Sequence, residues 1–203
     1  MKPIDIITKL EQLEYFKFLK EEDVLDYKNC LIENIENGWL DMPNQVLIDL
    51  KRGNGIQRNK PESIDRRSNV VDGEYLFRGG LETTLKKFQA IFESRNLKFE
   101  LSNNSEEYSD NNQYLKHKIT VNGIIYQVFD GMMERGTSEM DYLKSILRLL
   151  NEELKEQEYA NEQFRVLTSM EALYYLLIDT KTEDFIIELG GKVKSKIIDL
   201  NQY

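Results

Sequence analysis

His117 is the only histidine in this sequence, and histidine is the side chain that most often acts as a general base. A catalytic triad built on histidine or a metal site with two histidines therefore cannot form within one chain. His117 alternates with the apolar Leu115 and Ile119, which places it on the apolar face of a predicted strand. We interpret His117 as an interior histidine held by a hydrogen bond, in preference to a general base.

Cys30 is the only cysteine, so the chain can form neither an internal disulfide nor a metal site of several cysteines. It lies beside Leu31 in a predicted helix, where the nearby acids Glu33 and Glu36 would raise its pKa. A nucleophilic thiol needs a base or a cation close by. Cys30 is therefore predicted to be a small residue of the core.

Two carboxylates offer an alternative, enzymatic interpretation. Asp130 ends a predicted strand and Glu134 follows it closely, so the pair, with His117, could hold a divalent cation at the edge of a sheet. The alternative function is then a small metal-dependent hydrolase that uses clustered carboxylates. An Asp-Gly step after a strand is also an ordinary turn, and we assign no catalytic or metal-binding residue to the chain.

Glycine pairs in the sequence lack the partners that nucleotide binding requires. Gly79-Gly80 precedes a predicted helix but is followed by Leu-Glu-Thr in place of the Gly-Lys-Ser/Thr of a phosphate-binding loop. Gly53-Asn54-Gly55 has neither the preceding strand nor the third glycine of a dinucleotide site. Turns explain both pairs, and no cofactor is predicted.

The overall charge disfavours a nucleic-acid partner, because the formal net charge is −9 and phosphate neutralisation needs clustered basic residues. Residues 51–67 are the exception, since they hold six lysines and arginines against two acids. A nucleic-acid-associated factor using this stretch is a second alternative, with contacts from Arg52, Arg58, Arg66 and Arg67. The stretch has no aromatic residue on which a base could stack, which favours a solvated loop.

A run of acidic residues lies near the end of a predicted helix and has only Lys155 among it. Such a cluster can attract a basic protein by electrostatic steering, and a tyrosine beside it is a common interface anchor. A solvated helix face is the plainer interpretation. We predict a partner-binding surface here, made of Glu152, Glu153, Glu156, Glu158, Tyr159 and Glu162.

Periodicity predicts helices in the N-terminal quarter. Apolar residues spaced by three or four define one helix from Ile6, and a second begins near Glu22 and ends at Gly38. A short third helix follows Pro43 and extends to Leu50. Further along, residues 74–77 are predicted as a short strand, 81–92 as an amphipathic helix and 97–101 as a strand.

The strongest local prediction is a β-hairpin at Asn122-Gly123, which lies between two alternating runs. A two-residue loop makes Val121 oppose Ile124, and places His117 opposite Val128. The polar residues 102–114 before it are predicted as a loop. A helix with Ser138 as its N-cap follows.

The C-terminal third mixes strands with one ambiguous segment. Residues 164–167 and 185–189 are predicted as strands. Residues 169–178 fit either a helix or a strand, and we favour the helix. Together these elements predict an α+β fold, with N-terminal helices followed by a mostly antiparallel sheet and helices packed on it. The expected organisation is a helical region 1–52, a basic linker 53–68 and an α+β domain 69–203.

The longest apolar run, residues 173–178, is far shorter than the roughly 20 residues that cross a bilayer. No secretory signal is visible, so we expect a soluble cytoplasmic protein without a membrane partner. Because no catalytic set is evident, we expect a non-enzymatic binding protein for a basic protein partner. One concrete version is an acidic inhibitor of immunity-protein type. The oligomeric state is left open.

Overall fold

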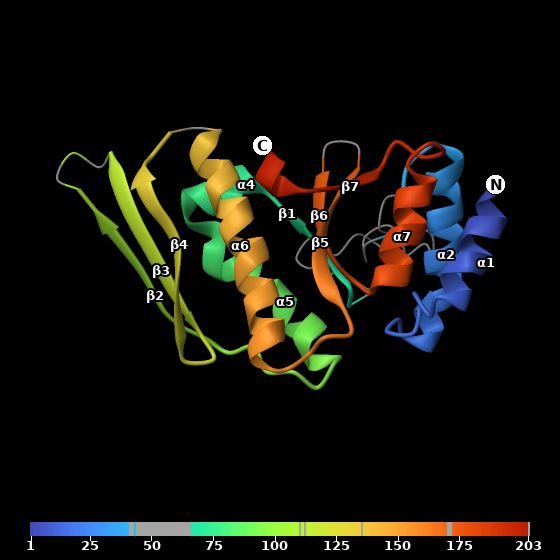
Figure 1. Ribbon diagram of the computed structural model, residues 1–203, viewed down its shortest axis with the longest axis horizontal. Helices are drawn as coiled ribbons and strands as arrows, with labels where there is room; N and C mark the ends of the chain where they lie inside the picture. The colour runs from blue at the N-terminus through green and yellow to red at the C-terminus, as the bar shows by residue number, and fades with distance from the viewer. Residues whose placement is uncertain are drawn as a thin grey trace, which may run out of the picture. The chain divides into compact units, whose positions relative to one another are not determined.

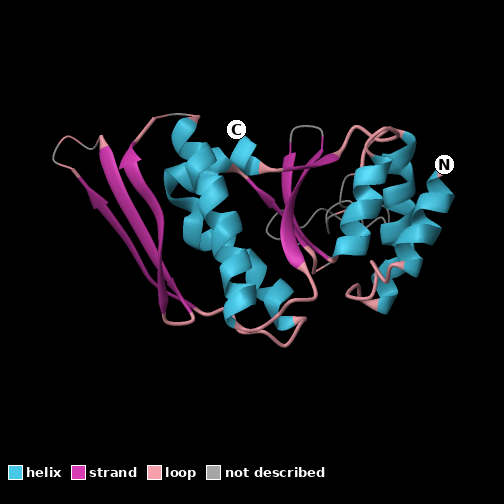
Figure 2. Ribbon diagram, viewed as in Figure 1, coloured by secondary structure: helices cyan, strands magenta, loops and turns pink. Residues whose placement is uncertain are grey.

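The computed structural model describes residues 1–40, 43, 66–109, 111, 113–134, 136–169 and 172–202. It confirms the predicted α+β class: helices and strands are both abundant, and N-terminal helices precede the sheets (Figure 2). The chain forms two compact units. The first combines Met1–Asn69 with Arg165–Ile198, and the second combines Val70–Phe164 with Asp199–Tyr203. The expected domain 69–203 is thus divided between the two units.

The first unit packs three helices against a four-stranded sheet (Figure 1). The helices are α1 (Pro3–Gln12), α2 (Glu21–Glu36) and α7 (Thr180–Leu189). The sheet has the order β1-β6-β5-β7, with β1 (Ser68–Val71), β5 (Gln163–Ser169), β6 (Ala172–Ile178) and β7 (Lys196–Ile198). One hydrophobic core joins the N-terminal helices to β5, β6 and α7.

Both long N-terminal helices are confirmed. The second ends as predicted near Gly38, whose φ of +86° is the left-handed conformation that glycine adopts without strain. The predicted short helix 43–50 lies outside the described residues, apart from Pro43.

Two predictions in the C-terminal third are wrong. Residues 172–178 form strand β6 and not a helix, because β6 lies between β1 and β5 and its consecutive residues Leu176 and Leu177 are both fully buried. A strand covered on both faces has an unbroken apolar run, as a buried helix also has. Residues 185–189 belong to helix α7, since Asp179 caps its N-terminus by accepting a hydrogen bond from the Thr182 amide at 2.8 Å. The strand predicted for residues 164–167 is confirmed as β5.

The second unit places helices on one face of a three-stranded antiparallel sheet (Figure 1). The sheet order is β2-β3-β4, with β2 (Leu101–Tyr108), β3 (Tyr114–Val121) and β4 (Ile124–Met132). The helices are α4 (Gly73–Tyr75), α5 (Leu81–Glu93) and α6 (Thr137–Glu156), with a turn η1 (Leu76–Gly80) and a C-terminal turn η2 (Leu200–Gln202). Helix α6 packs on β4.

The Asn122-Gly123 hairpin is confirmed, and Val121 opposes Ile124 as predicted. The register then shifts, so that His117 opposes Phe129 and not Val128. A β-bulge places two residues of one strand opposite one residue of the other. Here it lets the consecutive Val128 and Phe129 both be buried, 1% and 5% exposed.

Four further predictions in this unit are corrected. Residues 101–108 form strand β2 where a loop was expected from 102 onward, and 97–100 are not in a strand. Residues 74–77 begin in helix α4, because Asp72 accepts hydrogen bonds from the Glu74 and Tyr75 amides. Helix α6 starts one residue before Ser138, so that Gly136 and not Ser138 is its N-cap. The predicted helix 81–92 is confirmed as α5.

Candidate functional site

The six residues predicted to bind a partner cluster around the C-terminal end of α6, but the structure divides them. Glu152, Glu156 and Glu158 are exposed, and Tyr159 is half-buried. Glu153 and Glu162 are in the interior, 1% and 6% exposed. The predicted surface is therefore corrected: two of its five carboxylates cannot face a partner.

Glu153 is buried because it joins α6 to the β-hairpin. Its carboxylate accepts hydrogen bonds from the Tyr126 hydroxyl at 2.7 Å and from Asn122 Nδ2 at 2.6 Å. Burial raises the pKa of Glu153, the two hydrogen bonds oppose that rise, and the nearby Glu156 and Glu152 add to it. The exposed glutamates therefore act electrostatically on the interior of the unit.

The spacing along α6 contained a signal for this burial. Residue 153 lies three positions after the buried Leu150 and four after the buried Leu149, which is the spacing of neighbours on one helix face. The residue type, an acid within an acidic run, pointed to solvent. The hydrogen-bond donors that make burial possible come from the hairpin, which is distant in sequence.

Glu162 is buried as one half of an ion pair with Arg95. Arg95 Nε lies 3.0 Å from Glu162 Oε2, and Nη2 lies 3.4 Å from Oε1. The Tyr159 hydroxyl donates to the same carboxylate at 2.6 Å. Burial, and then the bond to Glu162, raise the pKa of Tyr159 to about 12. The hydroxyl of Tyr159 is thus committed to the interior.

The three exposed glutamates, which we call the acidic end, occupy positions that disfavour the fold. Glu156 is the last residue of α6, where the helix dipole is negative and an anion is unfavourable. Glu152 and Glu156 are four residues apart and repel each other. Glu158 has a φ of +56°, which strains a residue other than glycine. Glu152 is partly compensated within the helix by an exposed contact with Arg148 at 3.9 Å.

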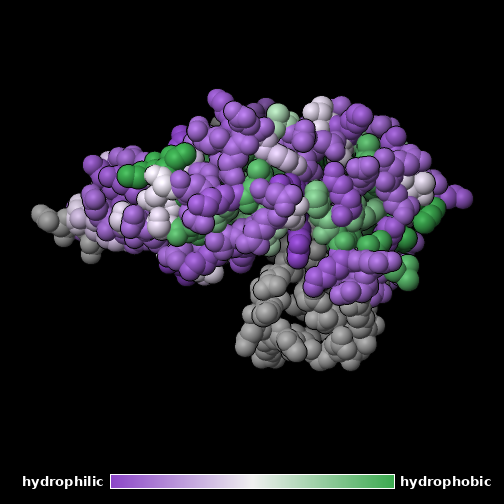
Figure 3. Space-filling view, turned by 90° about the horizontal axis from the view of Figure 1, so that it is seen from below, coloured by the Kyte–Doolittle hydropathy of each residue, from purple (hydrophilic) through white to green (hydrophobic). Residues whose placement is uncertain are grey.

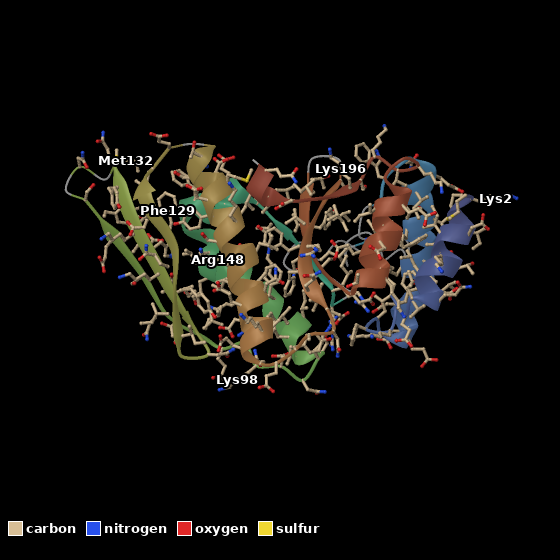
Figure 4. The ribbon with its side chains drawn as sticks, in the orientation of Figure 1. Lys2, Lys98, Phe129, Met132, Arg148 and Lys196 are labelled. Carbon is tan, nitrogen blue, oxygen red and sulfur yellow. The ribbon has the colours of Figure 1, made fainter. Side chains whose placement is uncertain are left out.

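Contacts around Lys98 connect the acidic end to the hairpin. Gln157 accepts from the Lys98 amide at 2.7 Å and donates to the Lys98 carbonyl at 2.9 Å, and Asn122 donates to the same carbonyl. Figure 4 shows Lys98 close to the C-terminal end of α6, and Arg148 nearer the middle of that helix. These links fix the first residues of β4 beside the acidic end.

Those first residues are exposed and apolar: Ile124 is 38% exposed and Ile125 is 70% exposed. Consecutive residues of a strand point to opposite faces, so both isoleucines cannot enter the core. The two adjacent isoleucines in a predicted strand therefore indicated, from the sequence alone, that an apolar side chain would be exposed here. Figure 3 shows green, hydrophobic residues among purple ones over the three-stranded sheet, at the left of that view.

His117 is an interior residue, as predicted, and is fully buried. Its Nδ1 lies 2.7 Å from the Tyr142 hydroxyl of α6 and its Nε2 lies 2.7 Å from Asn104 Oδ1 of β2. Phe129 points from β4 toward α6 (Figure 4) and stacks on Tyr142 with ring centroids 5.1 Å apart. Both ring nitrogens of His117 thus have partners.

The residues of the alternative metal site do not come together. Asp130 is exposed and accepts hydrogen bonds from Tyr114 at 2.5 Å and Gln127 at 2.8 Å, whereas His117 faces the interior. Glu134 is exposed. Within the described ranges, no three His, Cys, Asp or Glu side chains are grouped so that they could hold a metal ion.

The basic stretch 51–67 is described only at its end, at Arg66 and Arg67. Arg66 is exposed, but Arg67 is 1% exposed and lies in the interior of the first unit. Arg67 therefore cannot contact a nucleic acid, as the alternative function of a nucleic-acid-associated factor would require. Arg52 and Arg58 lie outside the described residues.

In the part of the chain that the structure describes, no helix combines the length and apolar character needed to cross a membrane. Comparisons with protein-family models, with curated proteins and with solved structures find no significant match. The function must therefore be argued from the residues and their geometry.

Replacing Glu153 with glutamine is expected to stabilise the second unit increasingly as the pH rises. The pKa of Glu153 is raised in the fold, so its contribution to stability is complete below the unfolded value and is lost as the pH rises through the folded pKa. Glutamine keeps an acceptor for Tyr126 or Asn122 without the charge. Urea unfolding of Glu153→Gln and of the parent, followed by circular dichroism at pH 5 and pH 8, measures the difference.

The exposed Glu152→Gln variant is the matched control and should show a much smaller change between the two pH values. A Glu153→Gln variant that loses stability relative to the parent as the pH rises would contradict the expectation.

Proposed function

We propose that this chain is a non-enzymatic binding protein that docks a basic protein partner at the acidic end, Glu152, Glu156 and Glu158. The observation that carries the proposal is that these glutamates lie where they weaken the fold, at the negative end of α6 and in a left-handed backbone conformation. Residues that lower the stability of the fold and make no compensating contact are commonly retained because they serve the function.

The surroundings of the acidic end suit an interface. Ile124 and Ile125 supply exposed apolar area beside the charges, and protein interfaces commonly combine an apolar centre with a polar rim. The hydrogen bonds of Glu153 and Gln157 hold this region in one arrangement before any partner arrives. A preorganised surface loses less conformational entropy on binding.

The acidic surface contributes mainly to the rate of association. Exposed charges steer a partner of opposite sign, and their effect weakens as salt screens them. One concrete form of the function is inhibition of a basic enzyme by covering its surface, as an immunity protein does to its toxin. This form rests on the overall acidity of the chain, with a net charge of −9, together with the acidic end.

The test is a charge-reversal variant, Glu152→Lys, Glu156→Lys and Glu158→Lys combined. Proteins captured by the parent from a lysate of the source cell at low salt are identified, and the affinity of each basic protein among them is measured against parent and variant. We expect the variant to bind a true partner at least about tenfold more weakly, since each lost steering charge affects the association rate.

The matched control reverses three exposed glutamates of the other unit, Glu21, Glu36 and Glu188, and has the same net charge. It should bind nearly as well as the parent. Equal losses in both variants would show that only net charge matters, and a partner indifferent to the acidic end would overturn the proposal.

A further inference from the structure

Strand β2 contributes little to the core. Seven of its eight residues are exposed, and only Leu101 is partly buried. Because β2 buries little apolar surface, it is held by its backbone pairing with β3 and by polar side-chain contacts. It is also an edge strand, paired on one side with β3.

Polar contacts with the buried His117 add to this backbone pairing. The β2–β3 register shifts between Ser102 and Ser105, where Asn103 has a φ of +47°. This irregularity places Asn104 so that its Oδ1 lies 2.7 Å from His117 Nε2. A side-chain amide oxygen only accepts, so Nε2 carries a proton. Burial lowers the pKa of His117 and so favours the neutral imidazole, in which Nδ1 accepts from the Tyr142 hydroxyl at 2.7 Å.

Within the described part of this unit, the ionisable groups near the imidazole come from β2 and α6. From β2, Glu106 Oε1 lies 3.7 Å from Nε2, and Glu106 Oε2 accepts from the Tyr108 hydroxyl at 2.6 Å. From α6 comes Tyr142, whose pKa is raised above its usual range mainly by burial. β4 places the non-ionisable Phe129 opposite His117. The neighbouring lysines of β3, Lys116 and Lys118, alternate with His117 and so point to the other face.

We propose that His117 is a proton-sensitive latch, whose protonation in mildly acidic conditions loosens strand β2 from the sheet. A proton on Nδ1 removes the acceptor of the Tyr142 hydroxyl and puts a charge in a site with no exposed surface. Release of β2 brings water to the charged ring. Among the described residues, Glu106 is the nearby anion that opposes release.

The direction of the pH dependence follows from the environment. Burial lowers the pKa of His117 below its usual 6.5, and Glu106 partly offsets this. The released state therefore binds a proton more tightly than the docked state. Docking of β2 is fully stable above about pH 6.5 and weakens as the pH falls from there toward the pKa of the docked state.

Amide hydrogen exchange of the parent protein, followed by NMR at pH 7.5 and pH 5.0 and corrected for intrinsic exchange rates, tests the latch. Protection of amides in β2, such as those of Glu106 and Tyr108, should fall by up to about tenfold per pH unit below 6.5. Amides of the β3–β4 hairpin in the same spectra, such as that of Gln127, should lose far less protection. Equal changes in both strand pairs, or none, would overturn the proposal.

A His117→Gln variant separates protonation from general acid sensitivity, because glutamine donates to Asn104 and accepts from Tyr142 without titrating. Its β2 protection should not depend on pH in this range, and retention of the full pH dependence would sink the idea. Should this variant fail to fold, direct NMR titration of the imidazole in the parent decides, since a pKa at or above 6.5 is incompatible with the latch.

Discussion

Replacing Arg67 with alanine is expected to lower the free energy of unfolding of the first unit by about 3–5 kcal/mol. Arg67 Nε donates to the Tyr15 carbonyl at 2.7 Å, Nη1 to the Leu177 carbonyl at 3.1 Å, and Nη2 to the Glu14 carbonyl at 3.3 Å. Its guanidinium also lies over the rings of Tyr15 and Phe18. Alanine removes the guanidinium donor from the Tyr15 and Leu177 carbonyls, whereas the Glu14 carbonyl keeps the Lys17 amide as a donor at 3.1 Å. It also leaves a cavity in place of a large, fully buried side chain.

Trp39 makes the measurement specific, because it is the only tryptophan and belongs to the first unit. Its fluorescence during urea unfolding should show a transition at lower denaturant concentration for Arg67→Ala. Arg67→Lys keeps the charge but loses the planar fork of donors, and should fall between the parent and Arg67→Ala.

Arg148→Ala is the control, since Arg148 is exposed and lies in the second unit. It should leave the Trp39 transition unchanged. An Arg67→Ala protein as stable as the parent would show that water or neighbouring side chains replace the guanidinium without loss.

The second large effect is expected for Glu162→Ala, which should destabilise the second unit by about 3–5 kcal/mol. The side chains of Arg95 and Glu162 are 1% and 4% exposed, so removal of the carboxylate leaves a guanidinium charge in the interior. Arg95 keeps Ser94 Oγ at 2.7 Å, but a hydroxyl does not balance a charge. Tyr159 loses its acceptor as well. Circular dichroism during urea unfolding measures the change.

A double variant shows whether the loss of stability comes from the missing ion pair or from the unpaired charge that remains in the interior. Arg95→Met combined with Glu162→Leu removes both charges at similar volume and should recover much of the lost stability. Glu152→Ala, at an exposed position of the same unit, should stay within about 0.5 kcal/mol of the parent. Additive losses in the Arg95 and Glu162 variants would contradict the interpretation of the two as a coupled pair.

Local patterns predicted elements wherever the local signal and the tertiary environment agreed. The Asn122-Gly123 turn and the amphipathic stripe of α5 are examples, since each depends on neighbours within a few residues. Prediction failed for β2 and β6 for opposite reasons. β2 is so polar that it resembles a loop, and β6 is so apolar that its period is hidden.

The candidate site shows the same division. The acidic run at 152–162 and the interior position of His117 could be predicted from residue type and spacing. The partners that allow Glu153, Glu162 and Arg67 to be buried could not be predicted, because they lie more than twenty residues away in the sequence. A charged residue enters the interior only when such partners satisfy it, and single-residue character contains no information about them.

The sequence by itself determined the α+β class, the hairpin, the main amphipathic helices and the charge of the chain. These follow from short-range periodicity and composition, which act before the chain is compact. Only the tertiary structure decided which glutamates remain exposed at the end of α6, that Arg67 is internal, and that residues 165–198 join the N-terminal helices. Those outcomes depend on long-range hydrogen bonds and shared apolar burial, which exist only once distant segments have packed together.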